Sequence, residues 1–348
     1  METMRIAVFT GVRQIQVETC ARPKATGNKA LVKIEATAIC TWEQRVYTGV
    51  NSVEFPFIGG HEIAGYIVAM GEDMNRQEWA IGDRVVIGAT LQCRNCLYCK
   101  EGHSECCPHF NHSAHLEGMP YRGMGGLSEY MLAPADCLFK YDHVTAEEAS
   151  IIEPVSCVVH SMEIANPALG DIVLIIGSGI MGLLHVQLAT RRGASVIVSD
   201  PNEERLAIAK RMGAKYVINP LKEDLPARVL EITKDMKAQI VFDATPLPRL
   251  IGDAFSCVAN AGKVILYSSM HPADSVPFDP NWIHGKSIQI LGTANSNDRD
   301  FVRASRLVSQ GIIDMKPFIS ATYPLDCVRD AFEEAIKGQA FRVVVKFS

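Results

Sequence analysis

The first 150 residues contain short segments in which apolar and polar side chains alternate, and glycine and proline residues separate them. Alternation with a period of two residues is typical of strands that bury one face. The pattern therefore predicts an antiparallel, barrel-like β domain. Its expected strands cover residues 4–10, 30–39, 64–71, 83–90 and 127–134.

The pattern changes from about residue 170 onward. Runs of residues that are apolar on both faces follow one another, and most are joined by stretches of helical length, such as residues 203–214. Strands buried on both faces are typical of a parallel sheet with helices on each side, so an α/β, doubly wound domain is expected. Its six expected strands are 171–177, 195–200, 215–219, 239–245, 262–269 and 287–293.

The last fifty residues contain two helical stretches and a closing strand, at 299–310, 325–337 and 341–348. We expect them to return to the first domain. The expected division of the chain is therefore 1–155, 156–293 and 294–348.

A glycine-rich turn follows the first strand of the second domain and leads into a helical stretch. In a dinucleotide site, Gly177 permits the tight turn, Gly179 lets the backbone approach a diphosphate, and Gly182 lets the helix pack close to the strand. The unpaired N–H groups of the helix then point at the phosphates. The expected cofactor-binding turn consists of Gly177, Ser178, Gly179, Ile180, Met181 and Gly182.

The next strand ends in Asp200. A carboxylate at this position accepts hydrogen bonds from a ribose diol and repels a 2′-phosphate, so the sequence favours NAD over NADP. Arg205 weakens this preference, because an arginine nearby can accommodate the extra phosphate or stack on adenine. The alternative is a glycine turn that binds nothing.

Five of the eleven cysteines lie between residues 93 and 107. Cys93, Cys96, Cys99 and Cys107 offer four thiolates at spacings that let one loop surround a tetrahedral ion, which is typical of structural zinc. Cys106 stands beside Cys107, and the residues alone do not exclude an exchange of roles. A redox-active or disulfide-bonded cluster is the alternative, which a reducing compartment disfavours.

Three separated segments hold side chains that together suit an open zinc site: Cys40, the pair His61-Glu62 in GGHEIAG, and Glu153 in IIEPVSC. Cys40 and His61 each have an ordinary interpretation as core residues. Glu153 has apolar neighbours, and a buried charge there needs a cation or a hydrogen-bonded partner. Thiolate, imidazole and carboxylate would leave zinc a fourth position for water or substrate, as in catalytic sites.

Taken in order, these motifs resemble those of the zinc-dependent medium-chain dehydrogenases, in particular the polyol, sorbitol and threonine dehydrogenase branch. The resemblance spans nearly the whole chain through GGHEIAG, CRNCLYCKEGHSECCP, GGLSEYMLAP, IIEPVSCVVH and GSGIMG. It implies a GroES-like β-barrel catalytic domain with a structural zinc lobe at about residues 90–110, a Rossmann-type domain that binds NAD, and two zinc ions per chain. The length of the lobe selects Cys107 as its fourth ligand.

The resemblance also implies a reaction, in which a secondary alcohol is oxidised to a ketone by hydride transfer to NAD⁺. Zinc would lower the pKa of the alcohol. In this branch either Glu62 or Glu153 completes the zinc ligands, directly or through bound water, so both are candidates.

The sequence departs from the branch just after Cys40. A hydroxyl residue and a histidine commonly pass the proton of the alcohol to solvent, but here Trp42 and Arg45 stand in their places. Indole is only a donor and guanidinium does not deprotonate near neutrality, so neither is a good relay. The expected routes are Thr41, or water leading to one of the two glutamates.

Trp42 and Arg45 also bear on the substrate. Trp42 offers a flat apolar wall, and Arg45 can form a bidentate pair with a carboxylate or another anion. A sugar acid or another acidic polyol is therefore one expected substrate, beside neutral polyols and sugar alcohols. The alternative is that Arg45 points to solvent or pairs with a structural acid such as Glu43.

The composition excludes some partners and suggests others. The 348 residues carry a formal net charge of −5, which gives no basic field for nucleic acid or an anionic membrane surface. The N-terminal residues lack the apolar core of a signal peptide and the longest apolar run is too short to span a bilayer, so a cytoplasmic protein is expected. An exposed strand edge at 287–293 suggests a homodimer or homotetramer.

Two other functions stay open on the sequence alone. One is a zinc-free reductase of the same superfamily with vestigial metal positions, and the other is a nucleotide-binding protein without turnover. A third metal site is not expected, because no complete ligand set of recognised spacing includes the histidines of the loop after the cysteines. These are His109, His112 and His115.

Overall fold

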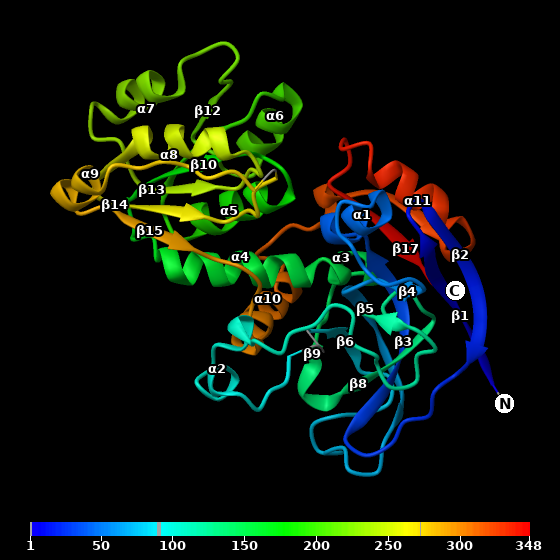
Figure 1. Cartoon of the computed structure of the whole chain (residues 1–348). Helices are drawn as coiled ribbons and strands as arrows, with labels where there is room; N and C mark the ends of the chain where they lie inside the picture. The colour runs from blue at the N-terminus through cyan, green and yellow to red at the C-terminus, as the bar shows by residue number, and fades with distance from the viewer. Residues whose placement is uncertain (1, 89–91, 272) are drawn as a thin grey trace. The chain divides into compact units, whose positions relative to one another are not determined.

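The computed structural model describes residues 2–88, 92–271 and 273–348 of the chain. The chain forms two compact units: unit 1 comprises Met1–Ser156 and Ser296–Ser348, and unit 2 comprises Cys157–Asn295 (Figure 1). The boundaries expected from the sequence, 155/156 and 293/294, lie close to these. Both ends of the chain belong to unit 1.

Unit 1 is built on two β-sheets. One has the strand order β2-β1-β4-β7, and the other has the order β16-β17-β3-β5-β6-β9 with β8 also paired to β3. Most neighbours are antiparallel, but β16 with β17 and β4 with β7 are parallel. The strands are β1 (Thr3–Gly11), β2 (Gln14–Ala21), β3 (Lys29–Ala38), β4 (Phe57–Ile58), β5 (Glu62–Met70), β6 (Arg84–Ile87), β7 (Arg122–Gly123), β8 (Tyr130–Pro134), β9 (Leu138–Lys140), β16 (Ile319–Pro324) and β17 (Arg342–Lys346).

The alternating pattern predicted the strands that bury one face, and it missed the edge strands. β2 (QIQVETCA) and β16 (ISATYP) each lie at the end of a sheet and are only partly buried; both sequences alternate between polar and apolar residues, but neither was among the expected strands. The strand expected at 83–90 is β6, and positions 89 and 90 lie outside the described residues.

Aromatic rings from both ends of the chain meet in the core of unit 1. The ring of Phe332 lies 5.1 Å from that of Phe9 and 5.2 Å from that of Tyr47, measured between ring centroids. Phe332 belongs to a C-terminal helix, so the last segment of the chain completes the core that the first strand begins. The helices of unit 1 are α1 (Thr41–Thr48), α2 (Leu97–Lys100), α3 (Ala146–Ser150), α10 (Asp298–Ser309) and α11 (Val328–Ala335), and α4 (Ile152–Ala165) contains the boundary with unit 2.

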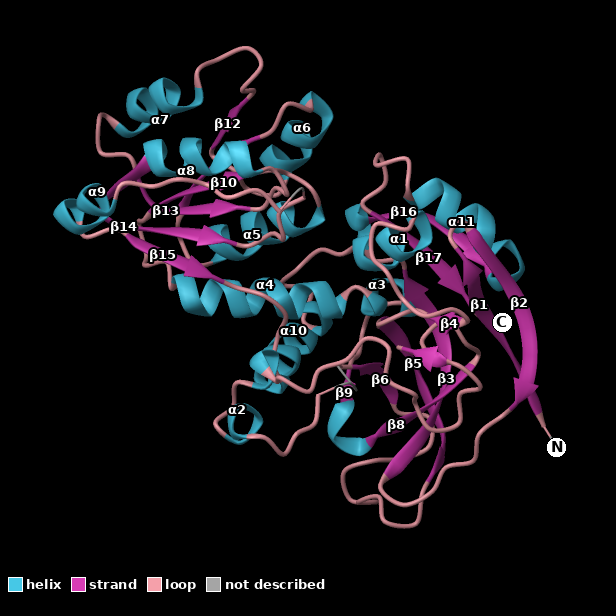
Figure 2. Ribbon diagram, viewed as in Figure 1, coloured by secondary structure: helices cyan, strands magenta, loops and turns pink. Residues whose placement is uncertain are grey.

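Unit 2 is the expected doubly wound domain. Its six strands are parallel and follow the order β12-β11-β10-β13-β14-β15, which is the strand order 3-2-1-4-5-6 of a Rossmann fold. Helices lie on both sides of the sheet (Figure 2). The strands are β10 (Ile172–Ile176), β11 (Ser195–Ser199), β12 (Tyr216–Ile218), β13 (Ala238–Asp243), β14 (Val258–Leu266) and β15 (Gln289–Gly292), and the helices are α5 (Ile180–Arg191), α6 (Glu203–Arg211), α7 (Leu225–Thr233), α8 (Ile251–Cys257) and α9 (Pro280–Lys286).

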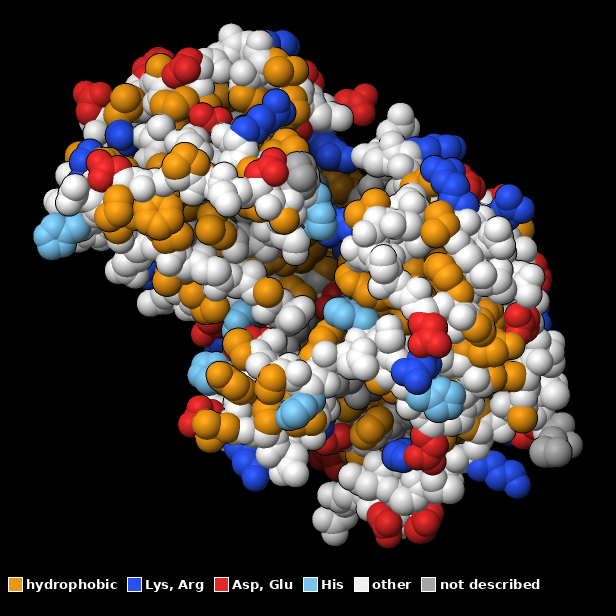
Figure 3. Space-filling model, viewed as in Figure 1, with side chains coloured by type: hydrophobic (Ala, Val, Ile, Leu, Met, Phe, Trp, Pro, Cys, Tyr) orange, Lys and Arg blue, Asp and Glu red, His pale blue; other side chains and the backbone are white. Residues whose placement is uncertain are grey.

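The surface agrees with the modest net charge. On the face drawn in Figure 3, basic and acidic side chains are interspersed and do not form one continuous positive patch. Within the described residues, no helix is both long enough and apolar enough to cross a lipid bilayer.

Candidate functional site

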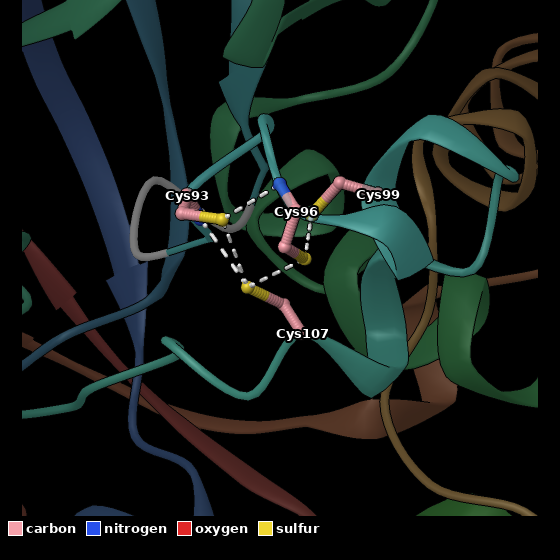
Figure 4. A group of neighbouring side chains, drawn as sticks. All are labelled: Cys93, Cys96, Cys99 and Cys107. Atoms are coloured by element: carbon pink, nitrogen blue, oxygen red, sulfur yellow. Dashed lines mark hydrogen bonds between the residues drawn. The ribbon is translucent and has the colours of Figure 1, made fainter.

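Four cysteine thiols in the loop that contains α2 point toward one another (Figure 4). The Sγ–Sγ distance is 3.5 Å from Cys96 to Cys99, 3.6 Å from Cys93 to Cys107, and 4.0 Å from Cys96 to Cys107. A tetrahedral ion with Zn–S bonds of about 2.3 Å sets these distances at about 3.8 Å. The cluster therefore has the dimensions of a closed zinc site.

Cys107, and not Cys106, is the fourth member of this cluster, since Cys107 is buried while Cys106 is exposed. The crowded thiols differ widely in acidity. A hydrogen bond from the backbone of Asn95 lowers the pKa of Cys93 to about 6, whereas desolvation and the neighbouring thiols raise the pKa of Cys99 to about 12. A cation would remove this conflict because it stabilises the thiolate form of every ligand.

The second cluster is assembled by the register of three adjacent strands in the larger sheet of unit 1. Ala38, the last residue of β3, lies opposite Glu62 of β5 and opposite Val344 of β17. The position after the end of β3 and the first positions of β5 and β17 therefore share one end of the sheet. Cys40 and Arg342 reach this end from segments 302 residues apart.

Cys40, His61 and Glu62 meet at this end of the sheet. One donor atom from each, a sulfur, a ring nitrogen and a carboxylate oxygen, lies within 4.8 Å of the other two. Burial and the charge of Glu62 raise the pKa of the Cys40 thiol, while His61 and Arg342 oppose this rise. The set offers the thiolate, imidazole and carboxylate ligands of an open zinc site and leaves a fourth position free.

Glu43 orients His61. Glu43 Oε1 lies 2.7 Å from His61 Nδ1 and accepts a hydrogen bond from the Gly60 N–H at 2.9 Å. Burial lowers the pKa of His61, but Glu43 and Cys40 outweigh it and hold the pKa well above its usual value. With Nδ1 donating to Glu43, Nε2 is the nitrogen available to a metal.

Glu43 was not expected as part of the site. The sequence interpretation considered it as a partner of Arg45, and the structure contradicts that pairing. Glu43 is 1% exposed and faces His61, and its Oε2 atom has no hydrogen-bond partner among the described residues. The sequence feature that could have indicated Glu43 is its position three residues after Cys40, in the first turn of a helix whose N-cap residue is Cys40.

Arg342 holds Glu62 in a buried ion pair. Its Nε and Nη2 atoms donate to Glu62 at 2.8 Å, and the two side chains are 4% and 0% exposed. Burial opposes the charge of Arg342, but Glu62 and Cys40 raise its pKa beyond the usual range. With Cys40 bound as a thiolate and His61 as a neutral ligand, Cys40, Glu43 and Glu62 would carry three negative charges around Arg342, and a divalent ion would complete the balance.

Glu153, the other expected carboxylate, is not among the three gathered donors. It lies in the first turn of α4, and its charge contributes to the raised pKa of Arg342. Its backbone oxygen accepts a hydrogen bond from Ser156 Oγ at 2.6 Å. Glu153 therefore lies near the Glu62–Arg342 pair, while Glu62 is the carboxylate placed beside Cys40 and His61.

Trp42 packs against two other aromatic rings in unit 1. Its indole stacks on the ring of His112 with centroids 4.4 Å apart, and the ring of Phe110 meets His112 edge-on at 4.7 Å. Burial lowers the pKa of His112, and His61 adds to this effect. Trp42 and His112 line a cavity of about 420 Å³. The sequence singled out His112 only as one of three loop histidines without a metal role, and nothing in its spacing relates it to Trp42.

Thr41 and Arg45 lie on the same short helix as Trp42. Thr41 is exposed at its first position, and Arg45 is partly exposed. Burial lowers the pKa of Arg45, and the charge of Cys40 acts in the opposite direction. Arg45 therefore lies near Cys40.

The glycine turn of unit 2 has the geometry expected of a dinucleotide site. Gly177 has φ +97°, a conformation that side chains rarely adopt. A Cβ on Gly182 would lie 1.9 Å from the Gly177 oxygen, so only glycine permits this close packing of α5 on the turn. A Cβ on Gly179 would meet nothing within 4 Å, which leaves open space at the helix start. Ile180 and Met181 begin α5.

Asp200 stands at the end of β11, beside the glycine turn. Its Oδ2 atom accepts a hydrogen bond from the Ser178 N–H at 2.7 Å, and its Oδ1 atom accepts one from the Asn202 N–H at 2.8 Å. Arg205 follows in α6 and is partly exposed. The Ser178 hydroxyl and Asp243 Oδ2 are buried and have no hydrogen-bond partner in the part of the chain that the structure describes. These polar atoms suit a ligand that carries hydroxyl groups.

Comparison with known proteins agrees with both units. A family model described as an alcohol dehydrogenase GroES-like domain matches residues 26–143, and one described as a zinc-binding dehydrogenase matches residues 181–310.

Relatives match almost the whole chain. It is 30% identical to a D-arabitol-phosphate dehydrogenase of Enterococcus avium, over 93% of this chain and 91% of that protein. It is also 30% identical to a sorbitol dehydrogenase of Bacillus subtilis, over 99% of this chain and 97% of that protein. Among solved structures, an Escherichia coli oxidoreductase of unknown specificity superposes with a TM-score of 0.90 at 26% identity, and each chain is covered to 100%.

The four-cysteine cluster predicts a metal count. The change Cys99→Ser should remove one of about two zinc ions per chain, because three thiolates and a hydroxyl do not close the site. Elemental analysis of the purified protein measures this count. Cys106→Ser is the matched control and should keep both ions; loss of an ion from this control alone would contradict the assignment.

The contact between Glu43 and His61 predicts a change in metal affinity. Glu43→Gln keeps the size of the side chain but weakens the hydrogen bond that orients His61, so zinc affinity should fall about 10- to 100-fold. Competition with a chelator measures the zinc affinity of the site formed by Cys40, His61 and Glu62. Glu72→Gln, at an exposed position, is the control; equal affinities in all three proteins would refute the role of Glu43.

Proposed function

The chain belongs to the zinc-type alcohol dehydrogenase family, in its polyol dehydrogenase branch, and from this premise we propose an NAD-dependent enzyme that oxidises a secondary alcohol to a ketone. The expected substrate is a polyol, a sugar alcohol or a sugar acid. One observation carries the proposal: Cys40, His61 and Glu62 gather their donor atoms within 4.8 Å. The glycine turn of unit 2, in the same chain, would bind the nicotinamide cofactor that the reaction also requires.

The proposed roles follow from the contacts. When bound, zinc supplies a Lewis acid that lowers the pKa of the alcohol, and the nicotinamide accepts the hydride. Cys40, His61 and Glu62 hold the ion, with Glu153 as the other carboxylate within the same region. Glu43 fixes the tautomer of His61.

The proton of the alcohol needs a route that avoids Trp42 and Arg45. Glu62 is bound to Arg342 through both oxygens, so it is a poor proton acceptor. We assign the proton to Thr41 Oγ1, which is exposed at the start of α1, or to water that leads to Glu153. Both groups are able to exchange a proton with solvent.

The substrate class rests on the relatives and on Trp42. One relative is named for a phosphorylated pentitol and the other for a hexitol, so polyols are the first candidates. Trp42, whose indole stacks on His112, lines the cavity of about 420 Å³ and contributes aromatic surface of the kind on which the carbon skeleton of a sugar alcohol can rest.

The cofactor preference rests on Asp200. A carboxylate at the end of the second strand of a Rossmann domain favours a free ribose diol over a 2′-phosphate. We also propose that the protein acts in the cytoplasm as a homodimer or homotetramer that pairs through the edge strand β15.

The proposal predicts turnover that depends on zinc. Nicotinamide absorbance should rise when NAD⁺ and a panel of polyols and sugar acids meet the zinc-loaded protein. The change Cys40→Ser should lower kcat/KM at least about 100-fold, since it removes a ligand. Full activity in a folded protein without zinc would favour the zinc-free reductase, and NAD⁺ binding without turnover on any alcohol would favour a binding protein.

The position of Asp200 predicts cofactor choice. Asp200→Asn retains a hydrogen-bond acceptor but removes the charge, so the ratio of kcat/KM for NAD⁺ to that for NADP⁺ should fall about 10- to 100-fold. Steady-state kinetics with each cofactor give this ratio. Glu204→Gln, on the exposed face of α6, should leave it unchanged. An unchanged ratio in Asp200→Asn would argue against this basis for the preference.

A further inference from the structure

Arg45 lies on the side of α1 that faces away from the core. Successive residues of a helix are about 100° apart, so the buried residues Glu43, Val46 and Tyr47 share one side and Arg45 lies on another. Side chains of a helix lean toward its N-terminus, which here is Cys40. The electrostatic effect of Cys40 on Arg45 agrees with this direction.

The guanidinium of Arg45 forms no hydrogen bond or ion pair with any described residue, although Arg45 is only partly exposed. Glu43 is committed to His61 and Gly60. The Cys40 thiolate would share its charge with a bound metal. A cation partly removed from water without an anion is unfavourable, so an arriving anion would be stabilised there.

The surroundings of this helix suit a hydroxylated ligand. The loop after α1 is tied back to it, because Asn51 donates its N–H to the Arg45 oxygen at 3.0 Å and its Nδ2 to the Trp42 oxygen at 3.4 Å. Trp42, His112 and Asn51 line a cavity of about 420 Å³ beside this helix, and Arg45 is not among the described residues that line it. No carboxylate lies among those lining residues.

We propose that Arg45 binds a carboxylate or phosphate group of the substrate, which makes the substrate an acidic polyol. The planar guanidinium donates two parallel hydrogen bonds to such a group. This inference rests on the proposed function, because it takes the ligand near Cys40 to be the alcohol that reacts. The diphosphate of the cofactor has the same chemistry, and the experiment separates the two sources.

The test compares two ligands that differ in one group. D-Gluconate carries a carboxylate where D-sorbitol carries a hydroxymethyl group, and sorbitol 6-phosphate adds a phosphate. Calorimetric titration of the zinc-loaded full chain without cofactor gives each affinity. We expect the two anions to bind more tightly than sorbitol, and Arg45→Gln to weaken them at least about 10-fold while sorbitol changes less than about 2-fold.

Two further variants keep the result interpretable. Arg45→Lys retains the positive charge but lacks the planar group that donates two parallel hydrogen bonds, so it should bind the anions with intermediate affinity. If Arg45→Gln does not fold, the anion affinities of Arg45→Lys test the inference instead. Arg76→Gln removes an exposed arginine and should have no effect. A separate titration with NAD⁺ identifies a role toward the diphosphate.

Three results would overturn the inference. They are anions that bind the wild-type protein no better than sorbitol, equal losses for anions and sorbitol in Arg45→Gln, and a loss confined to NAD⁺. Binding needs no hydride transfer, so these outcomes are independent of turnover. If an anion binds through Arg45 but the protein oxidises no alcohol, the proposed function is wrong and the anion site is still supported.

Discussion

The buried ion pair between Arg342 and Glu62 is the constraint on which the candidate zinc site depends. Both side chains are almost fully removed from water, so loss of either partner would leave an uncompensated buried charge. The pair fixes Glu62 beside His61 and Cys40 and joins β17 to the start of β5. The C-terminal segment is therefore part of the site, which gives a physical reason for the chain to return to unit 1 after unit 2.

The charges around this pair explain why a metal fits there. With a metal bound, the Cys40 thiolate, Glu43 and Glu62 would bring three negative charges to the site, and Arg342 is the cation paired with Glu62. Glu43 and Cys40 raise the pKa of His61, which reflects the same excess of negative charge around its ring. The four-cysteine cluster shows the same conflict in its divergent thiol pKa values.

Much of this arrangement could be predicted from the sequence, because the informative features are local. The apolar runs of unit 2 and the spacing of Gly177, Gly179 and Gly182 report on turns and packing within a few residues. The four cysteines also act within one loop. GGHEIAG and IIEPVSC became informative only together with Cys40, since a single cysteine, histidine or glutamate has an ordinary structural interpretation.

The remaining site residues depend on pairings that no local pattern reports. Arg342 opens an apolar strand, where a charge needs a partner, but the sequence does not say that the partner is Glu62, 280 residues away. Likewise, Trp42 and His112 stack only because α1 meets the loop that follows the four cysteines. The sequence offered Glu43 only as an alternative partner of Arg45, whereas helical geometry places Glu43 on the core side with His61.

The most direct measurement of the central claim is a crystallographic anomalous difference map of the purified protein, recorded on both sides of the zinc absorption edge. The account predicts two zinc peaks per chain, one within the four cysteine thiols and one beside Cys40, His61 and Glu62. A single peak at the cysteines in protein saturated with zinc, with no density beside Cys40, would contradict it.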